Sequence, residues 1–427
     1  MGNISFSKFQ WAFFIFVVGF ACVNIIMSFA LFFDGDIGCD FQFRYNEIKC
    51  CKAGTNPYAI WSETEPSEVY RSFQRDDGKG QTVHVYPPWE YTFVSPLTCF
   101  SKRTASRIYY ALHLGGVLLI GTVAFRLGYR RHQSGVHGCF VAACAFATGR
   151  ALRSALGTQN FGFLIAAAIV LMIMALHKRR DVLAGLCWAF IMVKPLLGLL
   201  FIIPLLIGRK YLTIAVAVAT CLLASIPPAI WCDTSPIVLI HNVANSVDVH
   251  FATTGLFPSP LPQLFAPYLP FQCLVVTNML IVVPLCLLLT WKLRKETWYI
   301  MMCPATACSV AWYLSRGHDF NVYAIVLMCV GLHFLHTPKR NEKILGACVI
   351  IVSMGSGLIS LFRKLFDLLP SALPPQGLEF VAATMSKYDF VTQFGAIAFI
   401  LMVIWLWRLP TNLTAGLFDF DKTHHRE

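Results

Sequence analysis

The chain is poor in charged residues. Asp, Glu, Lys and Arg make up 13% of its 427 residues, whereas hydrophobic residues make up 57%. A soluble domain carries about 25% charged residues, so this chain could not cover its surface with polar groups in water. Apolar runs long enough to cross a bilayer as helices recur along the sequence. The sequence therefore predicts an all-α polytopic membrane protein.

Other absences exclude further classes of protein. The cations behind the net charge of +12 are scattered in short loops rather than massed on one face, so we do not expect nucleic-acid binding. No internal repeat relates two halves of the chain, as it does in many secondary transporters. No small-residue cleavage site follows the first apolar run, 11–33, which we therefore interpret as a retained signal anchor.

The sixteen cysteines do not form a disulfide scaffold, because most of them lie inside apolar runs, where Cys acts as a small hydrophobic residue. Four of them, Cys39, Cys50, Cys51 and Cys99, lie in the first polar loop. If that loop faces an oxidising compartment, one disulfide can form among them, and the sequence does not select the pair.

We expect about eleven or twelve membrane spans. They lie near residues 11–33, 109–126, 137–154, 160–177, 182–193, 195–207, 211–231, 272–291, 298–315, 320–336, 344–362 and 389–407. The two short spans within 182–207 meet at Lys194-Pro195, and they are either two full crossings or a re-entrant hairpin. All of these segments are expected to form a single integral membrane domain over residues 1–427.

Clusters of Lys and Arg beside alternate span ends indicate the cytoplasmic side of the membrane. On this basis we expect both termini in the cytoplasm of an inner (plasma) membrane protein. The opposite, outer side then receives three longer loops, 34–108, 232–271 and 363–388.

The first outer loop begins with three carboxylates, Asp34, Asp36 and Asp40. A single Asp at such a position most often only marks the interface. Here, however, the stretch from Asp40 to Lys52 mixes aromatic and charged residues and predicts an amphipathic helix on the membrane surface, with Asp40 near its N-cap.

Cations are expected on the same outer face. Lys194 lies within an apolar run, where a charge is costly and marks a candidate functional site, although it could also be a snorkelling lysine at a broken helix. Arg150 lies near an outer span end, and Arg316, His318 and Asp319 form an ionic turn. Each of these residues alone could be a capping or interface residue.

One carboxylate facing several cations at a bilayer surface suits the transfer of a sugar from a lipid phosphate. A base must accept the proton of the acceptor hydroxyl, and fixed cations stabilise the phosphate that leaves. Asp34-Gly35-Asp36 matches the Asp-x-Asp pattern of nucleotide-sugar transferases, but the soluble nucleotide-binding domain of those enzymes is missing. Asp36 and Asp34 are therefore alternative positions for the base.

Several short motifs, in order along the chain, resemble glycosyltransferase family 87. They are Asp40-Phe41-Gln42-Phe43-Arg44-Tyr45, Gly54-Thr55-Asn56-Pro57-Tyr58, Tyr86-Pro87-Pro88 with Ser95-Pro96-Leu97, Gly157-Thr158-Gln159-Asn160, Lys194-Pro195 and Arg316-Gly317-His318-Asp319-Phe320. The Gln159-Asn160 motif departs from the family's Gly-Gln-x-Asn by one inserted or shifted residue.

The resemblance implies a GT-C fold, a polyprenyl-phosphate sugar as donor, inversion at the anomeric carbon and Asp40 as general base. It implies a hexose, expected to be mannose, and a lipid-linked or cell-surface glycan as acceptor. The expected contacts with the donor phosphate come from Lys194, Arg316, His318 and Arg150. The expected contacts with the substrates come from Arg44, Tyr45, Tyr58, Tyr86, Gln159, Asn160 and Asp319, and for the tyrosines an interfacial aromatic belt is the alternative.

Two other functions stay open on the sequence alone: a transporter or flippase of lipid-linked sugars, and an enzyme similar to the O-antigen ligases. We expect no cofactor and assign no metal ligands. The chemistry does not require a divalent ion, although Asp34 and Asp36 keep the binding of such an ion as an alternative. Membrane lipids are the other expected partners, and the oligomeric state is open.

Overall fold

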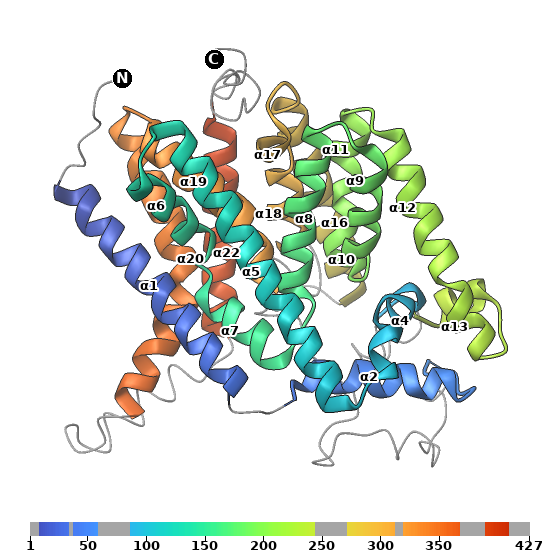
Figure 1. Ribbon diagram of the computed structural model, residues 1–427. Helices are drawn as coiled ribbons and strands as arrows, with labels where there is room; N and C mark the ends of the chain where they lie inside the picture. Colours follow the sequence, from blue (N-terminus) through green and yellow to red (C-terminus); the bar gives the residue numbers. More distant parts are fainter. Residues whose placement is uncertain are drawn as a thin grey trace, which may run out of the picture. The chain divides into compact units, whose positions relative to one another are not determined.

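The computed structural model describes residues 8–33, 37–58, 86–243, 271–311, 319–367 and 389–409. In these ranges every regular element is a helix and none is a strand (Figure 1). The expected all-α class is therefore confirmed. The chain divides into two compact units, one made of residues 1–30, 117–154 and 258–427, the other of residues 31–116 and 155–257.

Four helices in the described ranges are long and apolar enough to cross a membrane. They are Lys8–Ala30, Lys102–Arg131, Tyr211–Trp231 and Asp319–His336. Large apolar side chains on them are exposed, among them Leu118 at 70% and Ile230 at 71%. Exposure of many large apolar side chains is unfavourable in water and suits contact with lipid. The molecule is therefore a membrane protein with several spanning helices.

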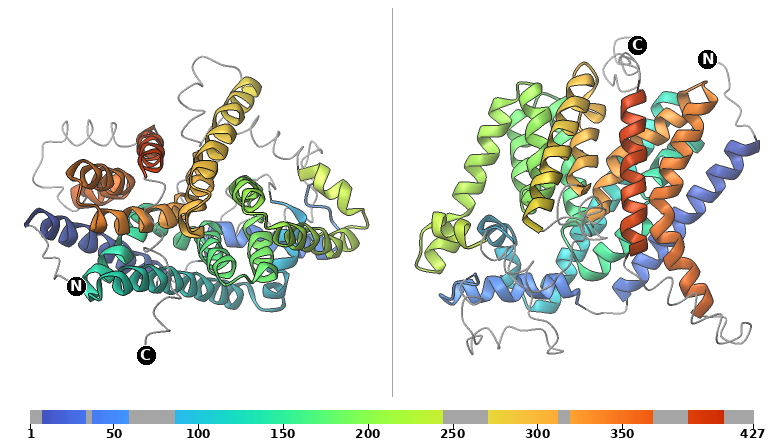
Figure 2. Two further views of the ribbon diagram at one scale, coloured as in Figure 1. Left: turned by 90° about the horizontal axis from the view of Figure 1, so that it is seen from above. Right: turned by 180° about the vertical axis from the view of Figure 1, so that it is seen from behind.

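The unit formed by residues 1–30, 117–154 and 258–427 is a helical bundle. It contains α1 (Lys8–Phe33) except its last turn, the second half of α5 (Lys102–His132), α6 (Gly135–Ala145), the start of α7 (Gly149–Thr158), α16 (Phe271–Lys292), α17 (Trp298–Met301), α18 (Cys303–Ala311), η4 (Asp319–Tyr323), α19 (Ala324–His336), α20 (Arg340–Asp367) and α22 (Asp389–Arg408). Helix α22 lies beside α20 (Figure 2). Three rings, Phe13, Phe140 and Phe334, meet with centroids 5.3–6.0 Å apart and fasten α1 to α6 and α19.

The unit formed by residues 31–116 and 155–257 holds most of the candidate residues. It contains α2 (Cys39–Lys52), α4 (Pro88–Val94), η2 (Ser95–Cys99), the first half of α5, the end of α7, α8 (Gly162–His177), α9 (Asp181–Ile191), α10 (Pro195–Gly198), η3 (Leu199–Phe201), α11 (Ile202–Ile207), α12 (Tyr211–Ala224) and α13 (Ile226–Trp231). Helix α9 packs against both α8 and α12, and α4 packs against α2, α12 and α13 (Figure 1).

One expected span in the middle of the chain is interrupted. The predicted span 137–154 consists of α6 and α7 with a break between Ala145 and Gly149. The end of α7 then meets α8 at an angle of 112°. The corner holds Gln159, whose φ of +54° is uncommon for a residue other than glycine. The bend therefore lets the side chains of Gln159 and Asn160 contact neighbouring elements, which one straight helix would not allow.

The hairpin predicted at 182–207 is also made of short pieces. Helix α9 ends at Ile191, and α10, η3 and α11 follow from Pro195 to Ile207. Proline fixes φ and suits the first position of a helix, so Pro195 starts α10. Lys194 takes the N-cap position with non-helical backbone angles. The charge that was costly inside an apolar run therefore lies at a helix break.

Helix α2 forms where the sequence predicted a helix, but most of its side chains are buried. Gly38 is the N-cap and Asp40 lies in the first turn, where the helix dipole favours a negative charge. Lys49 and Lys52 lie in the last turn, where it favours a positive charge. Phe41 and Ile48 pack in the interior together with polar residues of the same helix. Helix α2 is thus an integral part of its unit.

Candidate active site

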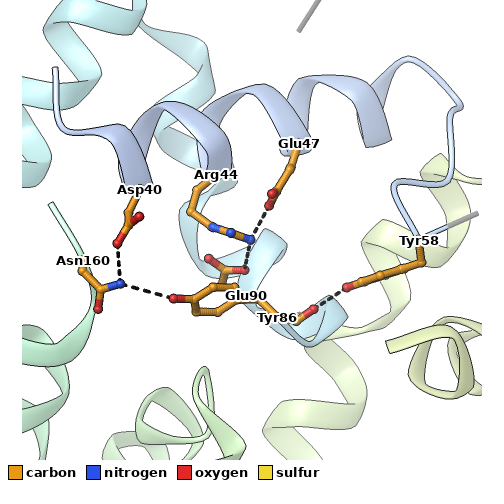
Figure 3. A network of polar contacts seen from close by, with 7 residues as sticks. All are labelled: Asp40, Arg44, Glu47, Tyr58, Tyr86, Glu90 and Asn160. Atoms are coloured by element: carbon orange, nitrogen blue, oxygen red, sulfur yellow. Dashed lines mark hydrogen bonds and ion pairs between the residues drawn. The ribbon is translucent and has the colours of Figure 1, made fainter. Parts of the chain in front are cut away.

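Asp40, Asn160 and Lys194 form a chain of hydrogen bonds. The Asn160 side-chain amide Nδ2 donates to Asp40 Oδ2 at 2.6 Å (Figure 3), and Lys194 Nζ donates to Asn160 Oδ1 at 2.7 Å. Asn160 is 3% exposed, whereas Asp40 and Lys194 are half-buried. Three elements, α2, the α7–α8 corner and the start of α10, therefore bring a carboxylate and a cation to the two ends of one amide.

Asn160 is itself held in a fixed orientation. Its Oδ1 also accepts the backbone N–H of Gly162 at 2.9 Å. On the main chain, its carbonyl oxygen lies 2.9 Å from His113 Nε2, to which the histidine donates in the tautomer protonated at that nitrogen. Because Oδ1 accepts two donors, the amide cannot turn over without losing both. The fixed amide directs Nδ2 toward Asp40.

Tyr86 lies beside this chain and between two cations. Its hydroxyl accepts a long hydrogen bond of 3.4 Å from Asn160 Nδ2. The Arg44 guanidinium stacks on its ring at 4.0 Å, and Lys194 Nζ lies 5.9 Å from the ring centroid. Burial raises the pKa of the Tyr86 hydroxyl, against the opposing effect of the two cations. Tyr86 therefore offers a neutral, half-exposed aromatic ring and hydroxyl beside Asp40.

A buried cluster of one cation and two carboxylates lies behind Tyr86. Asp40, Arg44 and Glu47 share one face of α2, and Arg44 forms an ion pair with Glu47 (Figure 3). Arg44 Nη1 also lies 3.9 Å from Glu90 Oε2, on α4. Glu90 is fully buried, and within the described residues neither of its oxygens accepts a hydrogen bond. Two carboxylates thus share one guanidinium, which favours retention of a proton.

Burial favours the protonated form of the Glu90 carboxyl. Burial raises its pKa to about 8, although Arg44 opposes the rise. Because this pKa lies above that of an unfolded Glu, the folded state binds the proton more tightly. The stabilisation is complete below pH of about 4.5 and is lost as the pH rises toward 8. Replacing Glu90 with Gln is expected to abolish this dependence, which thermal unfolding of the detergent-solubilised protein between pH 5 and pH 9 would measure.

Glu47→Gln is the matched control for this experiment. It leaves Arg44, which lowers the pKa of Glu90, and removes the charge of Glu47, which raises it, so the slope should persist but move to lower pH. A Glu90→Gln protein whose stability keeps the wild-type dependence on pH would show that Glu90 does not carry the proton.

Gln159 connects α2 to α5 rather than pointing to open space. Its Oε1 accepts from the Gly38 backbone N–H at 3.2 Å and from Ser106 Oγ at 2.9 Å, and its Nε2 donates to the Ser106 carbonyl at 3.3 Å. Both ends of the amide are therefore occupied, and the side chain is 5% exposed. In the described structure Gln159 fixes the start of α2, two residues before Asp40.

A glycine is required at position 38 because the start of α2 lies close against Thr158 and Gln159. A Cβ added there would lie 2.5 Å from the Thr158 carbonyl carbon and oxygen and 2.7 Å from Gln159 Cγ. Gly38→Ala must therefore shift the start of α2, which we expect to cost about 1–3 kcal/mol of stability. Because a shift of about 1 Å can cost 10²-fold in rate, activity should fall further than stability does.

Thermal unfolding and a transfer assay of Gly38→Ala would measure both effects. Gly115→Ala is the control, since no atom lies within 4 Å of a Cβ added there. Wild-type stability in Gly38→Ala would contradict the tight contact between the start of α2 and the α7–α8 corner.

The other two tyrosines of the predicted site are engaged by the backbone. Tyr45 donates from its hydroxyl to the Phe100 carbonyl at 2.7 Å, and Tyr58 donates to the Tyr86 carbonyl at 2.6 Å. Each is 4% exposed, whereas Tyr86 is half-buried. Tyr45 and Tyr58 therefore fasten the first loop, and Tyr86 is the tyrosine of the three with surface beside Asp40.

The structure does not relate the remaining predicted residues to this arrangement. Asp34, Asp36, Arg316 and His318 lie outside the described residues, as does the side chain of Arg150. Asp319 starts η4 in the other compact unit and is 3% exposed. Within the described ranges no group of three or more His, Cys, Asp or Glu side chains could hold a metal ion.

Sequence reasoning missed Glu90, Glu47, Ser106 and His113. A signal existed for two of them. Glu90 directly follows the Tyr86-Pro87-Pro88-Trp89 segment, and His113 is an isolated polar residue in an apolar run. Glu47 and Ser106 gave none, because a charged residue in a polar helix and a serine at a helix start are ordinary. Their importance depends on burial, which follows from the tertiary contacts.

A model of one protein family matches most of the chain. The model, described as glycosyltransferase family 87, covers residues 84–338 and so includes Tyr86, Asn160 and Lys194 but begins after Asp40. A comparison with curated proteins finds no match. The matched range is more than half of the 427 residues. The chain therefore belongs to glycosyltransferase family 87 and is a membrane glycosyltransferase.

Proposed function

We propose that the protein transfers one hexose, mannose in the first instance, from a polyprenyl phosphate to a hydroxyl of a lipid-linked or cell-surface glycan. The observation that carries this proposal is the chain of hydrogen bonds from Asp40 through Asn160 to Lys194. It supplies an acceptor of protons at one end and a cation at the other. Transfer from a lipid phosphate needs these two groups and no second carboxylic acid, in contrast to glycoside hydrolysis.

In the proposed reaction Asp40 is the general base. The acceptor oxygen attacks the anomeric carbon from the face opposite the phosphate, and its proton passes to the Asp40 carboxylate. The bond from the anomeric carbon to the phosphate oxygen breaks, and the electron pair stays on the polyprenyl phosphate. One displacement inverts the configuration. The Asn160 amide holds the carboxylate through Oδ2, and Asp40 Oδ1 is proposed to take the proton.

Lys194 is proposed to stabilise the phosphate that leaves. Its half-buried ammonium group donates to Asn160 Oδ1 and so lies within the same arrangement as the Asp40 carboxylate. Arg44 is less suited to this task, since Glu47 already neutralises it and the Tyr86 ring covers it. Tyr86 is proposed to contact the sugar. Arg150, Arg316 and His318 remain proposed contacts of the donor phosphate, Asp319 a proposed contact of the substrates, and Asp36 and Asp34 alternative bases.

The site is proposed to face the outer side of the plasma membrane, with both termini in the cytoplasm. This orientation follows from the Lys and Arg clusters beside alternate span ends. The whole chain is proposed to act as one GT-C membrane domain, without a cofactor.

A donor comparison with the purified protein in vesicles tests this function. The donors are polyprenyl-phosphate mannose, polyprenyl-phosphate glucose, a polyprenyl-diphosphate oligosaccharide and a nucleotide sugar, each with a glycolipid acceptor. We expect transfer from a monophosphate donor and none from the nucleotide sugar. Transfer from the diphosphate oligosaccharide alone would indicate a ligase, and movement of the donor across the vesicle without transfer would indicate a flippase. Either result would overturn the proposal.

A further inference from the structure

Two cysteines that are far apart in the sequence meet at the ends of α2 and α13. Cys51 lies in the last turn of α2, and Cys232 is the residue directly after α13. Their Sγ atoms are 2.9 Å apart although 181 residues separate them. Both belong to the same compact unit, and both are free thiols in this structure. The two sulfurs need to approach by less than 1 Å to reach the bond length of about 2.05 Å in a disulfide.

The surroundings of the two sulfurs hold them in this position. Cys51 is fully buried and Cys232 is 8% exposed. Helix α13 packs against both α2 and α4. Lys52 Nζ lies 5.3 Å from the Trp231 ring centroid, so the residues next to the two cysteines also meet. The approach of the sulfurs is therefore built into the packing of three elements.

Two simpler explanations account for less of this geometry. Most cysteines of the chain lie in apolar helices as small hydrophobic residues, but Cys51 and Cys232 lie at helix ends in the polar loops. A metal site would need further ligands, and within the described ranges no suitable group exists. The neighbouring Cys50 is also buried, yet its sulfur is not the one that faces Cys232.

We propose that Cys51 and Cys232 form a disulfide bond that fastens the carboxylate-bearing helix α2 to α13. The inference rests on the proposed function in one respect, namely that these loops face the oxidising outer side of the membrane. The sequence did not indicate this pair. It placed a possible disulfide among four cysteines of the first loop, and Cys232 lies outside that loop.

The oxidant is the disulfide of a thiol–disulfide oxidoreductase. The Cys232 thiolate attacks one sulfur of that disulfide, and the first carrier thiolate leaves. The Cys51 thiolate then attacks the Cys232 sulfur of the mixed disulfide, and the carrier departs as a dithiol with two electrons. The two thiol protons go to the released carrier thiolates and solvent. The hydrogen bond from the Cys51 thiol lowers the pKa of Cys232, which suits it to the first attack.

The test is a peptide map of the full-length protein. Membranes are denatured directly in N-ethylmaleimide, so that buried free thiols are blocked as well, and the protein is digested with and without reduction and analysed by mass spectrometry. We expect a peptide linking Cys51 to Cys232 that disappears on reduction. The link should persist in the Cys50→Ser control and be lost in Cys51→Ser and Cys232→Ser. Wild-type protein with both thiols blocked by maleimide would overturn the proposal.

Labelling of Cys99 separates failure of the disulfide from failure of the orientation. Cys99 is exposed and lies in the same first loop. A membrane-impermeant maleimide should label it in intact cells but not in Cys99→Ser. Free Cys51 and Cys232 thiols with an outward-facing Cys99 would refute the disulfide alone. Free thiols with Cys99 labelled only after permeabilisation would refute both the disulfide and the proposed orientation.

Discussion

Replacing Asp40 with Asn is expected to lower the transfer rate about 10²–10⁴-fold while the protein remains folded. The amide cannot accept the proton of the acceptor hydroxyl, so the general-base contribution is lost. Its oxygen can still accept the hydrogen bond that Asn160 Nδ2 now donates to Asp40 Oδ2 at 2.6 Å. The start of α2, which Gly38 and Gln159 hold through a separate bond, should not move. Initial rates with the purified protein and its thermal unfolding temperature measure the two effects.

Asp181→Asn is the matched control for Asp40→Asn. Asp181 starts α9 in the same unit and forms an ion pair with Lys210 at 2.9 Å. A partly exposed pair of this kind contributes about 0–1 kcal/mol, so its loss should leave the rate within a few-fold of wild type. Equal rates for Asp40→Asn and Asp181→Asn would show that Asp40 is not the general base. Asp36 and Asp34 would then be the next candidates.

Replacing Lys194 with Met should have the second-largest effect, a loss of about 10²–10³-fold in transfer rate. Methionine keeps the length of the aliphatic side chain, so packing at the start of α10 is retained. The change removes the positive charge that we place against the leaving phosphate. It also removes one of the two donors to Asn160 Oδ1, although the Gly162 backbone N–H still holds the amide. The kinetics of transfer from polyprenyl-phosphate mannose would measure the loss.

Two further variants separate charge from packing at this position. Lys194→Arg keeps the charge and should retain more activity than Lys194→Met. Lys210→Met removes a cation of the same unit whose partner is Asp181, and it should behave like wild type. If Lys194→Met transferred sugar as fast as Lys210→Met, the phosphate would not be stabilised by Lys194.

The sequence predicted residues whose chemistry is unusual for their surroundings. Lys194 drew attention because it is a charge in an apolar run, and Asp40 because it follows a membrane span. The structure brings both to Asn160, which the sequence marked only through a motif with a shifted residue. A charge beside lipid is costly and therefore needs a partner, which gives a physical reason for this grouping. The roles of these residues in sugar transfer stay predictions.

Other features could not be predicted because they depend on backbone geometry. Span 137–154 reads as one apolar run, but the helix breaks and then bends by 112° before α8. The role of Gln159 follows from its φ of +54° and from the proximity of Gly38, neither of which has a sequence signature. Likewise, the burial of Arg44 with Glu47 and Glu90 has no sequence signature, and the contact of Arg44 with substrate stays a prediction.

The central claim is that the protein performs a single inverting displacement on a polyprenyl-phosphate sugar with Asp40 as base. The most direct measurement is the anomeric configuration of the product that purified wild-type protein forms from polyprenyl-phosphate mannose, determined by nuclear magnetic resonance beside the same reaction with Asp40→Asn. We predict a product of inverted configuration from the wild type and almost none from the variant. A product of retained configuration, or equal amounts of product from both proteins, would contradict the account.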